Sequence, residues 1–334
     1  MIRCVLAVAM LVACATPTHA ASIEWVRVGD PGNVTDTTGY GAVADAFWIG
    51  KYETTIGQYC DFLNATARTD TYSLYNASMG TNLNIAGIVR SGSSGSYTYA
   101  VMTNGGTSAN RPITFVSWFD AARFANWMHN GQLTGTAGAA STETGAYTLN
   151  GATTGVAPVK NPGALYAIPT ENQWYKAAYY KGSGTNAGYW TYATRSNSAP
   201  GNVIGSGSNQ ANYAPGSRWS VTQSTSYSAS QNYLSDVGAF TSSSSAYGTF
   251  DQAGGVYEWN DLNGVAGTTR GFRGGVWQGD AFNISSAARN ALDPAVEGNG
   301  SGFRLVTSVP EPATLGLVAV GVAGGILYLA RRRA

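Results

Sequence analysis

The feature that most limits the possible folds of this chain is the long stretch from Lys181 to Gly248, in which no helical period survives. The stretch is rich in Ser, Gly, Asn and Tyr. Aromatic residues nevertheless recur through it, namely Trp190, Tyr213, Trp219, Tyr233 and Phe240. Because disordered segments are poor in aromatic residues, we expect long ordered loops here. The fold must therefore be rich in loops.

The composition of the whole chain agrees with this expectation. It contains 43 Gly, 20 Tyr and 9 Trp but only 11% charged residues, which is the profile of a loop-rich domain held by aromatic anchors. The 19 Lys and Arg residues nearly balance the 18 Asp and Glu residues. Such a balance gives no electrostatic reason to expect a nucleic-acid partner.

The first twenty residues have the pattern of a secretory signal peptide. Arg3 precedes the apolar run Val5 to Ala13, and Thr18-His19-Ala20 has the small-x-small form that signal peptidase cleaves. A second cut is open, because Leu11-Val12-Ala13-Cys14 also reads as a lipobox in which Cys14 would be acylated. Either cut predicts an exported chain with residues 1–20, or most of them, removed.

Residues 309–334 resemble a PEP-CTERM sorting signal. Pro310-Glu311-Pro312 is followed by 18 uncharged residues, Ala313 to Ala330, and by Arg331 to Arg333. As a helix the run would extend about 27 Å, enough to span a membrane, and the basic end would stay in the cytoplasm. The resemblance implies processing by an exosortase in an exopolysaccharide-producing bacterium and delivery to the cell envelope or beyond. A plain membrane anchor is the alternative.

The segment between these ends, residues 21–308, is expected to form one domain. Of the 3 Cys and 2 His in the chain, only Cys60 and His129 fall in it. One thiol cannot form an internal disulfide, and one thiol with one imidazole cannot build a structural zinc site. A metal in this domain must be held by oxygen, which favours calcium.

Three helix starts share one capping pattern. Thr55, Ser117 and Thr170 each stand three residues before a side chain that can reach back to the free backbone N–H groups, in Thr55-x-x-Gln58, Ser117-x-x-Asp120 and Thr170-x-x-Gln173. Apolar residues with helical spacing follow each start, and they place Cys60 on a buried face. Residues 85–90 and 96–101 predict a hairpin, and short strands are expected at 256–260, 272–277 and 303–306. These elements predict an α+β domain.

Five segments in order resemble the formylglycine-generating enzyme (sulfatase-modifying factor) family, a variant of the C-type-lectin-like fold. They are Phe47 to Thr55; Arg111 to Trp118; Ile168 to Glu171 with Trp174; Gly254 to Trp259; and Arg273 to Trp277, closing with Gly302-Phe303-Arg304. Large aromatic residues supply most of the buried area in a loop-rich fold, so we expect Trp118, Trp174, Trp259 and Trp277 in the core. We expect Arg273, Arg289 and Arg304 to form structural ion pairs or to bind carbonyl groups.

The resemblance implies a copper(I) oxidase that converts a substrate cysteine to formylglycine with a cysteine pair shortly after the Arg-Gly-Gly segment. Residues 277–289 contain no cysteine, and Gly279 stands about where the first would be. Copper(I) needs soft thiolate ligands, so copper is not expected and no catalytic residue is assigned. The former active-site cleft is expected at five candidate residues: Gly279, Asp280, Asn283, Ser285 and Arg289.

The family also binds calcium structurally, and the resemblance carries that site to particular residues. The carbonyl groups of Ala253, Gly254 and Val256 and the carboxylate of Glu258 match it, with Gly255 in place of the usual Asn. The alternative is that Glu258 pairs with an arginine such as Arg273.

Three functions follow from the sequence. The first is a non-catalytic recognition module for glycan or protein at the cell envelope, with exopolysaccharide or envelope proteins as partners. The second is an oxidoreductase of the sulfatase-modifying-factor type that uses residues other than cysteine. The third is a structural protein of the extracellular matrix.

Overall fold

The computed structural model describes residues 21–308, and few of them lie in regular elements. The helices are α1 (Ile56–Thr66), α2 (Ser78–Thr81), α3 (Trp118–His129) and α4 (Glu171–Tyr179), with a π-helical turn η1 (Ala139–Glu143) and a 3-10 turn η2 (Pro215–Ser217). The strands are β1 (Trp25–Val28), β2 (Phe47–Gly50), β3 (Ile88–Ser91), β4 (Thr98–Val101), β5 (Tyr166–Ala167), β6 (Tyr257–Asn260), β7 (Arg270–Arg273), β8 (Asn290–Leu292), β9 (Ser301–Gly302) and β10 (Val306–Thr307).

Helices α1, α3 and α4 begin where the capping pattern predicts. The side chains of Thr55, Ser117 and Thr170 each accept a hydrogen bond from the backbone N–H three residues on, and the side chain at that position accepts one from the backbone N–H of the cap residue. These reciprocal bonds satisfy backbone N–H groups that have no partner inside the helix. Helices α1 and α3 then pack through aromatic rings, with the centroids of Phe62 and Phe124 5.4 Å apart.

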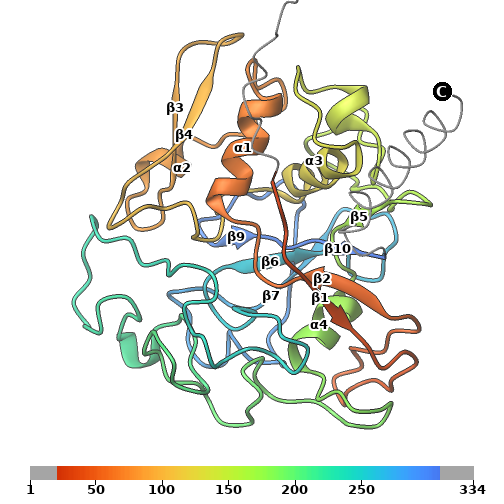
Figure 1. Cartoon of the computed structure of the whole chain (residues 1–334), viewed down its shortest axis with the longest axis vertical. Coiled ribbons are helices and arrows are strands. Elements are labelled where there is room, and N and C mark those ends of the chain that lie inside the picture. The colour runs from red at the N-terminus through yellow and green to blue at the C-terminus, as the bar shows by residue number, and fades with distance from the viewer. Residues whose placement is uncertain (1–20, 309–334) are drawn as a thin grey trace, which may run out of the picture.

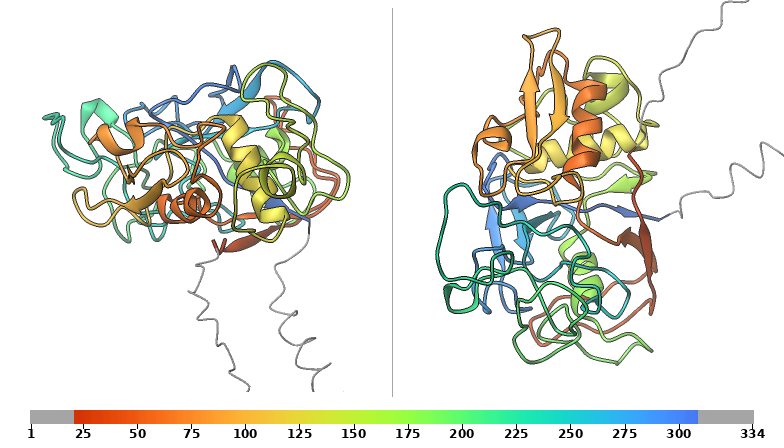
Figure 2. Two further views of the ribbon diagram at one scale, coloured as in Figure 1. Left: turned by 90° about the horizontal axis from the view of Figure 1, so that it is seen from above. Right: turned by 60° about the vertical axis from the view of Figure 1, so that its left-hand side comes forward.

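The strands form two small sheets and a separate hairpin. The first sheet has the order β1-β2-β10-β5, the second has the order β8-β7-β6-β9, and β3 pairs with β4 as the sequence predicts. In Figures 1 and 2 the strands of both sheets lie between α1 and α3 on one side and α4 with the long loops on the other. This layering is that of an α+β domain.

Two of the predicted strands differ in extent from those observed. β7 ends at Arg273 instead of reaching residue 277, because Gly274 and Gly275 have φ of +100° and +80° and turn the chain away. Residues 303–305 belong to no strand, since the chain there crosses from β9 in the second sheet to β10 in the first. The crossing carries Arg304 into the core, where its side chain is fully buried.

The loops between residues 181 and 248 are anchored through a second core cluster. This cluster forms around Trp174 and Tyr179 of α4 and includes Tyr192 and Tyr213 from the loops. Tyr233 and Phe240 are also buried. The aromatic residues that recur through the stretch therefore hold it against the domain, as predicted.

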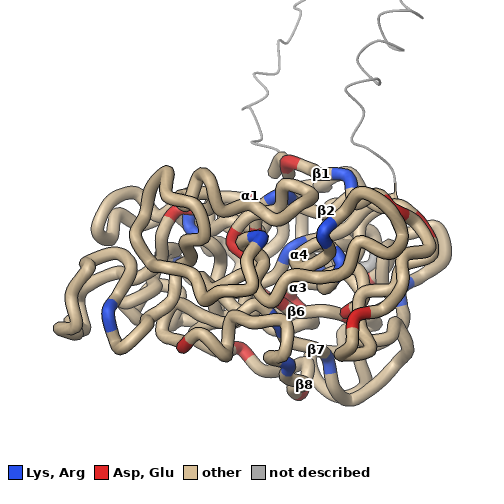
Figure 3. The backbone as a smooth tube through the Cα atoms, turned by 90° about the horizontal axis from the view of Figure 1, so that it is seen from below, with Lys and Arg blue, Asp and Glu red and all other residues tan. Residues whose placement is uncertain are grey.

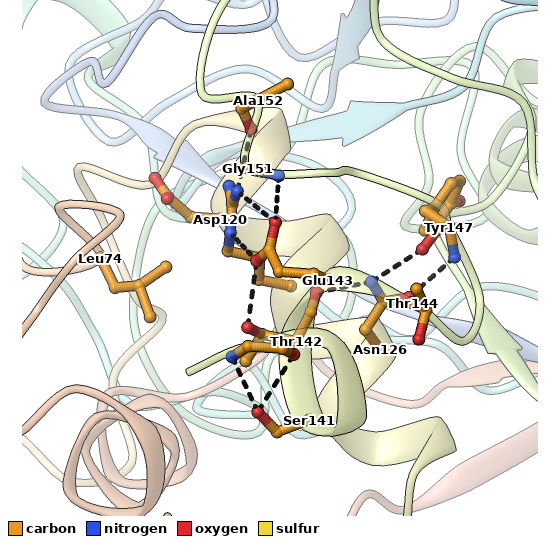
Figure 4. A network of polar contacts seen from close by, with 12 residues as sticks. Leu74, Asp120, Asn126, Ser141, Thr142, Glu143, Thr144, Tyr147, Gly151 and Ala152 are labelled. Atoms are coloured by element: carbon orange, nitrogen blue, oxygen red, sulfur yellow. Dashed lines mark hydrogen bonds and ion pairs between the residues drawn. The ribbon is translucent and has the colours of Figure 1, made fainter. Parts of the chain in front are cut away.

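A buried ion pair that the sequence did not reveal joins α3 to η1. Arg123 donates from Nε to Oε1 of Glu143 over 2.7 Å, and neither side chain is appreciably exposed. Figure 4 shows Glu143 also receiving hydrogen bonds from Thr142 and from the backbone of Gly151. The pair fixes a loop that has little regular structure of its own.

Charged residues of both signs are scattered over the domain without a single-sign area along the backbone (Figure 3). Within residues 21–308 no helix has the length and apolar character needed to cross a membrane. The predicted signal peptide at 1–20 and the predicted membrane helix at 313–330 both lie outside the described residues.

Candidate functional site

The loop between β7 and β8 corresponds to the segment in which the formylglycine-generating enzymes carry their cysteine pair. Its entrance depends on glycine, because a Cβ atom on Gly275 would lie 2.5 Å from Cγ2 of Ile284. Such a contact is shorter than side chains tolerate, so only glycine lets the loop fold back on itself here. The loop is therefore closed at its base.

A ladder of aromatic rings leads from the surface to this loop. Trp277 lies parallel to Tyr233, with ring centroids 5.0 Å apart, and Tyr233 lies nearly parallel to Tyr227 at 5.9 Å. Trp277 is 3% exposed, whereas Tyr227 is 58% exposed. Trp277 is buried in the core, and so are Trp118, Trp174 and Trp259, as predicted.

Four of the five candidate cleft residues make their hydrogen bonds within or directly beside the loop. The amide of Asn283 donates to Oδ1 of Asp280 over 3.0 Å, and the amide of Asp280 donates to Oδ1 of Asn283 over 3.1 Å. Ser285 donates to the carbonyl of Phe282, and the carbonyl of Gly279 accepts from the amide of Ala214. These groups hold the loop in shape.

Arg289, the fifth candidate, makes its hydrogen bonds outside the loop. Its Nε donates to Oε1 of Glu171 over 2.9 Å and its Nη2 donates to Oε2 over 3.1 Å. Arg273 binds the same carboxylate from Nε over 2.7 Å and also donates to the carbonyl groups of Ser286 and Ala288. The structural ion pairs predicted for Arg273 and Arg289 are therefore present.

An open pocket of about 300 Å³ lies beside Arg289. Its lining consists of Gly39, Tyr40, Glu171, Asn172, Leu262, Asn263 and Arg289. Gly279, Asp280, Asn283 and Ser285 do not line it. The pocket thus unites residues from four distant segments that the sequence did not bring together.

The residues present do not fit a copper(I) centre. Cys60 lies on α1 and is 5% exposed, and burial raises the pKa of its thiol to about 12. The thiol therefore stays protonated, while copper(I) requires thiolate ligands. Within residues 21–308 no three Cys, His, Asp or Glu side chains gather closely enough to hold a metal ion.

Glu258, the predicted calcium carboxylate, is fully buried and hydrogen-bonded at both oxygens. Arg304 donates from Nε to Oε2 over 2.6 Å and from Nη2 to Oε1 over 2.8 Å. Trp174 donates its indole N–H to Oε2 over 2.8 Å. Glu258 therefore has an arginine partner, as the alternative predicted, and that partner is Arg304 instead of Arg273. The calcium site at the carbonyl groups of Ala253, Gly254 and Val256 stays a prediction.

Two further buried carboxyl groups face Arg304. Oε2 of Glu53 lies 3.6 Å from Nη2 of Arg304, and within the described residues neither oxygen of Glu53 makes a hydrogen bond. Burial, followed by the charge of Asp251, raises the pKa of Glu53 well above its usual value. Burial raises the pKa of Asp251 to about 6. The sequence signals for this cluster were the positions of Glu53 and Arg304 within the matching segments, and no signal pointed to Asp251.

This architecture defines a class: a loop-rich α+β domain of the C-type-lectin-like, formylglycine-generating-enzyme fold. Residues 33–309 match the family described as the sulfatase-modifying factor enzyme 1-like domain, and the chain belongs to that family. Residues 308–333 match the PEP-CTERM protein-sorting motif, which implies export, anchoring through the C-terminal segment and recognition by an exosortase.

Three solved structures are similar to this chain. Variable protein 1 of Treponema denticola is 18% identical, over 85% of this chain and 95% of its own, with a TM-score of 0.46. CarF is 20% identical, over 87% of this chain and 100% of its own, with a TM-score of 0.47. PvdO from Pseudomonas aeruginosa is 18% identical, over 86% and 92%, with a TM-score of 0.41. No curated protein matches the chain.

Proposed function

We propose that this protein is a non-catalytic recognition module of the cell envelope that binds glycan or protein. The observation that carries the proposal is the absence of cysteine from residues 277–289, the segment that would have to hold the redox metal. The polar groups of Asp280 and Asn283 bind each other there. The loop therefore keeps the family's fold without the ligands of its oxidase chemistry.

Delivery to the envelope is supported by the sorting motif at residues 308–333. In this proposal signal peptidase removes residues 1–20 and an exosortase processes the C-terminal end, so both enzymes are partners of the precursor. The mature domain then meets exopolysaccharide or other envelope proteins. Nucleic acid is not among the partners that the mixed charge distribution favours.

An oxidoreductase that uses other residues is the competing function. It would require Asp280, Asn283, Ser285 and Arg289 to act on one substrate. Arg289 lines a pocket that contains none of the other three. This separation favours recognition over catalysis. A purely structural matrix protein is the third possibility, and it needs no binding pocket.

The first prediction is that the protein does not generate formylglycine. The purified full-length protein is incubated with copper(I), oxygen and a peptide carrying a sulfatase-type cysteine, and aldehyde is measured by mass spectrometry. We expect no product, because residues 277–289 contain no cysteine to hold copper and the only thiol in the described residues is buried and protonated at neutral pH.

A Cys60→Ser variant is the matched control, since it removes that thiol from any background oxidation. Formylglycine produced in both proteins at a rate above the protein-free reaction would overturn the proposal. A glycan array and the host's own exopolysaccharide test the binding function directly. If both are uniformly negative and no envelope protein is captured, the structural matrix function takes precedence.

A further inference from the structure

The pocket beside Arg289 is lined by Glu171 and Arg289, and Arg273 behind the lining brings a second positive charge to the same carboxylate. Glu171 is the carboxylate in its wall, and two guanidinium groups, those of Arg273 and Arg289, share it. One negative charge between two positive charges leaves a net positive charge at this wall. Arg273 is buried, whereas the Arg289 side chain is 37% exposed, so the excess charge is presented to the pocket by Arg289.

Two asparagine side chains in the pocket lining have NH₂ groups that can donate hydrogen bonds, while their carbonyl oxygens already accept bonds from the backbone. Oδ1 of Asn172 accepts from the amide of Gly41 over 3.0 Å, and Oδ1 of Asn263 accepts from the amide of Val265 over 3.4 Å. Each bond fixes the amide group so that its NH₂ end points away from the backbone donor. Within residues 21–308 neither NH₂ group, nor Nη1 of Arg289, makes a hydrogen bond.

Tyr40 completes this wall. Its ring lies 4.7 Å from the guanidinium carbon of Arg273 and 5.5 Å from that of Arg289. Contact with the ring of Tyr175, at a centroid distance of 5.9 Å, holds it further in place. The pocket therefore combines a fixed aromatic ring, one exposed cation and two amide donors.

We propose that this pocket binds a hexuronate unit, that is, a sugar ring bearing a carboxylate. A carboxylate accepts charge-assisted hydrogen bonds from the guanidinium group, and sugar oxygens accept from the amides of Asn172 and Asn263. The volume of about 300 Å³ is at the lower end of the range for small-ligand pockets, and the pocket is open, so a saccharide chain can continue into solvent. This inference rests on the proposed recognition function and specifies its ligand class.

The test is calorimetric titration of the purified full-length protein with three probes of similar size. They are trigalacturonate, the neutral trisaccharide of galactose, and a tripeptide with a free terminal carboxylate. One charge-assisted hydrogen bond corresponds to about tenfold or more in affinity. We therefore expect trigalacturonate to bind at least about tenfold more tightly than either other probe.

Two pocket variants and one control connect the binding to these residues. Arg289→Gln should remove the preference for trigalacturonate over the neutral trisaccharide. Asn263→Ala changes an exposed side chain whose one hydrogen bond within the fold is the 3.4 Å contact with the amide of Val265, and it should weaken trigalacturonate binding severalfold. Arg68→Gln alters an exposed arginine outside the pocket and should leave binding unchanged. If Arg289→Gln fails to fold, Asn263→Ala decides the question.

Equal affinity for the acidic and neutral trisaccharides would overturn the hexuronate assignment, as would unchanged binding by Asn263→Ala. Preference for the tripeptide would replace the sugar with a peptide carboxylate. In those cases binding to other glycans on an array would leave the recognition function standing. Formation of formylglycine, by contrast, would remove the recognition function itself.

Discussion

Arg304 is the residue on which the charge balance of the core depends. Its guanidinium group is fully buried and donates to Glu258 and to the carbonyl groups of Gly50, Lys51 and Phe250. It thereby joins the end of β2 to β6 and to the loop before β6. A buried charge of this kind is tolerated only when it is paired and its donors are satisfied.

Replacing Arg304 should therefore cost far more stability than replacing a cation at the surface. We expect Arg304→Met to lower the free energy of unfolding by about 3–5 kcal/mol, because it leaves Glu258 buried without a counter-charge. Lys51→Met, which breaks the exposed pair with Glu24, should cost about 1 kcal/mol or less. Urea unfolding of both variants measures the two costs. Equal costs would contradict the proposed dependence on Arg304.

The predicted calcium site can be tested at Glu258, whose oxygens the ion would have to share with Arg304. Binding of an ion to the folded state alone stabilises it, so a calcium chelator should lower the melting temperature of the wild type. Glu258→Gln keeps an acceptor for the indole of Trp174 but loses the charge, and its melting temperature should not respond to the chelator. An unchanged wild-type melting temperature would leave Arg304 as the sole counter-charge.

At the scale of the elements, the sequence predicted what depends on near neighbours. The starts of α1, α3 and α4 are set by side chains three residues apart, and the β3–β4 hairpin is set by its turn. Of the first sheet only a strand at 303–306 was expected, and β1, β2 and β5, of two to four residues each, were not predicted. β10 itself has only two residues and pairs with β2 more than two hundred positions away. Strands that short carry no periodicity of their own.

The same contrast applies to the candidate site. Arginine ion pairs were predicted because Arg273, Arg289 and Arg304 stand in or near matching segments, although the partner of Glu258 proved to be Arg304. The pocket was not predicted apart from Arg289. Tyr40 precedes β2, and Asn263 follows β6. Only the folded chain places these residues in one wall.

At the scale of the whole molecule, the domain compensates for its scarcity of regular elements with buried polar and aromatic side chains. Helices α1 and α3 belong to one core cluster, while Trp174 and Tyr179 of α4 pack with residues of the long loops in a second cluster. Burial raises the pKa values of Asp120, Asp251 and Asp261, so these carboxyl groups bind protons more tightly than in the unfolded chain. The stability of the domain should consequently depend on pH.

Three such groups set the expected pH window. Burial raises the pKa of Asp120 to about 7 and the pKa values of Asp251 and Asp261 to about 6. Because the folded chain holds these protons more tightly, the associated stability is full below about pH 4 and is lost as the pH rises through 6 and 7. We expect the free energy of unfolding to be lower at pH 7.5 than at pH 4.5, by about 1.4 kcal/mol for each pKa unit by which a group's pKa is raised within this interval. Urea unfolding at pH 4.5 and pH 7.5 measures the difference.

Asp120→Asn should reduce this difference in the free energy of unfolding, whereas Asp45→Asn, at an exposed position, should not. A domain that gains stability over this interval would show that these carboxyl groups are ionised and paired in the folded state, since ionised and paired carboxylates bind protons less tightly than those of the unfolded chain.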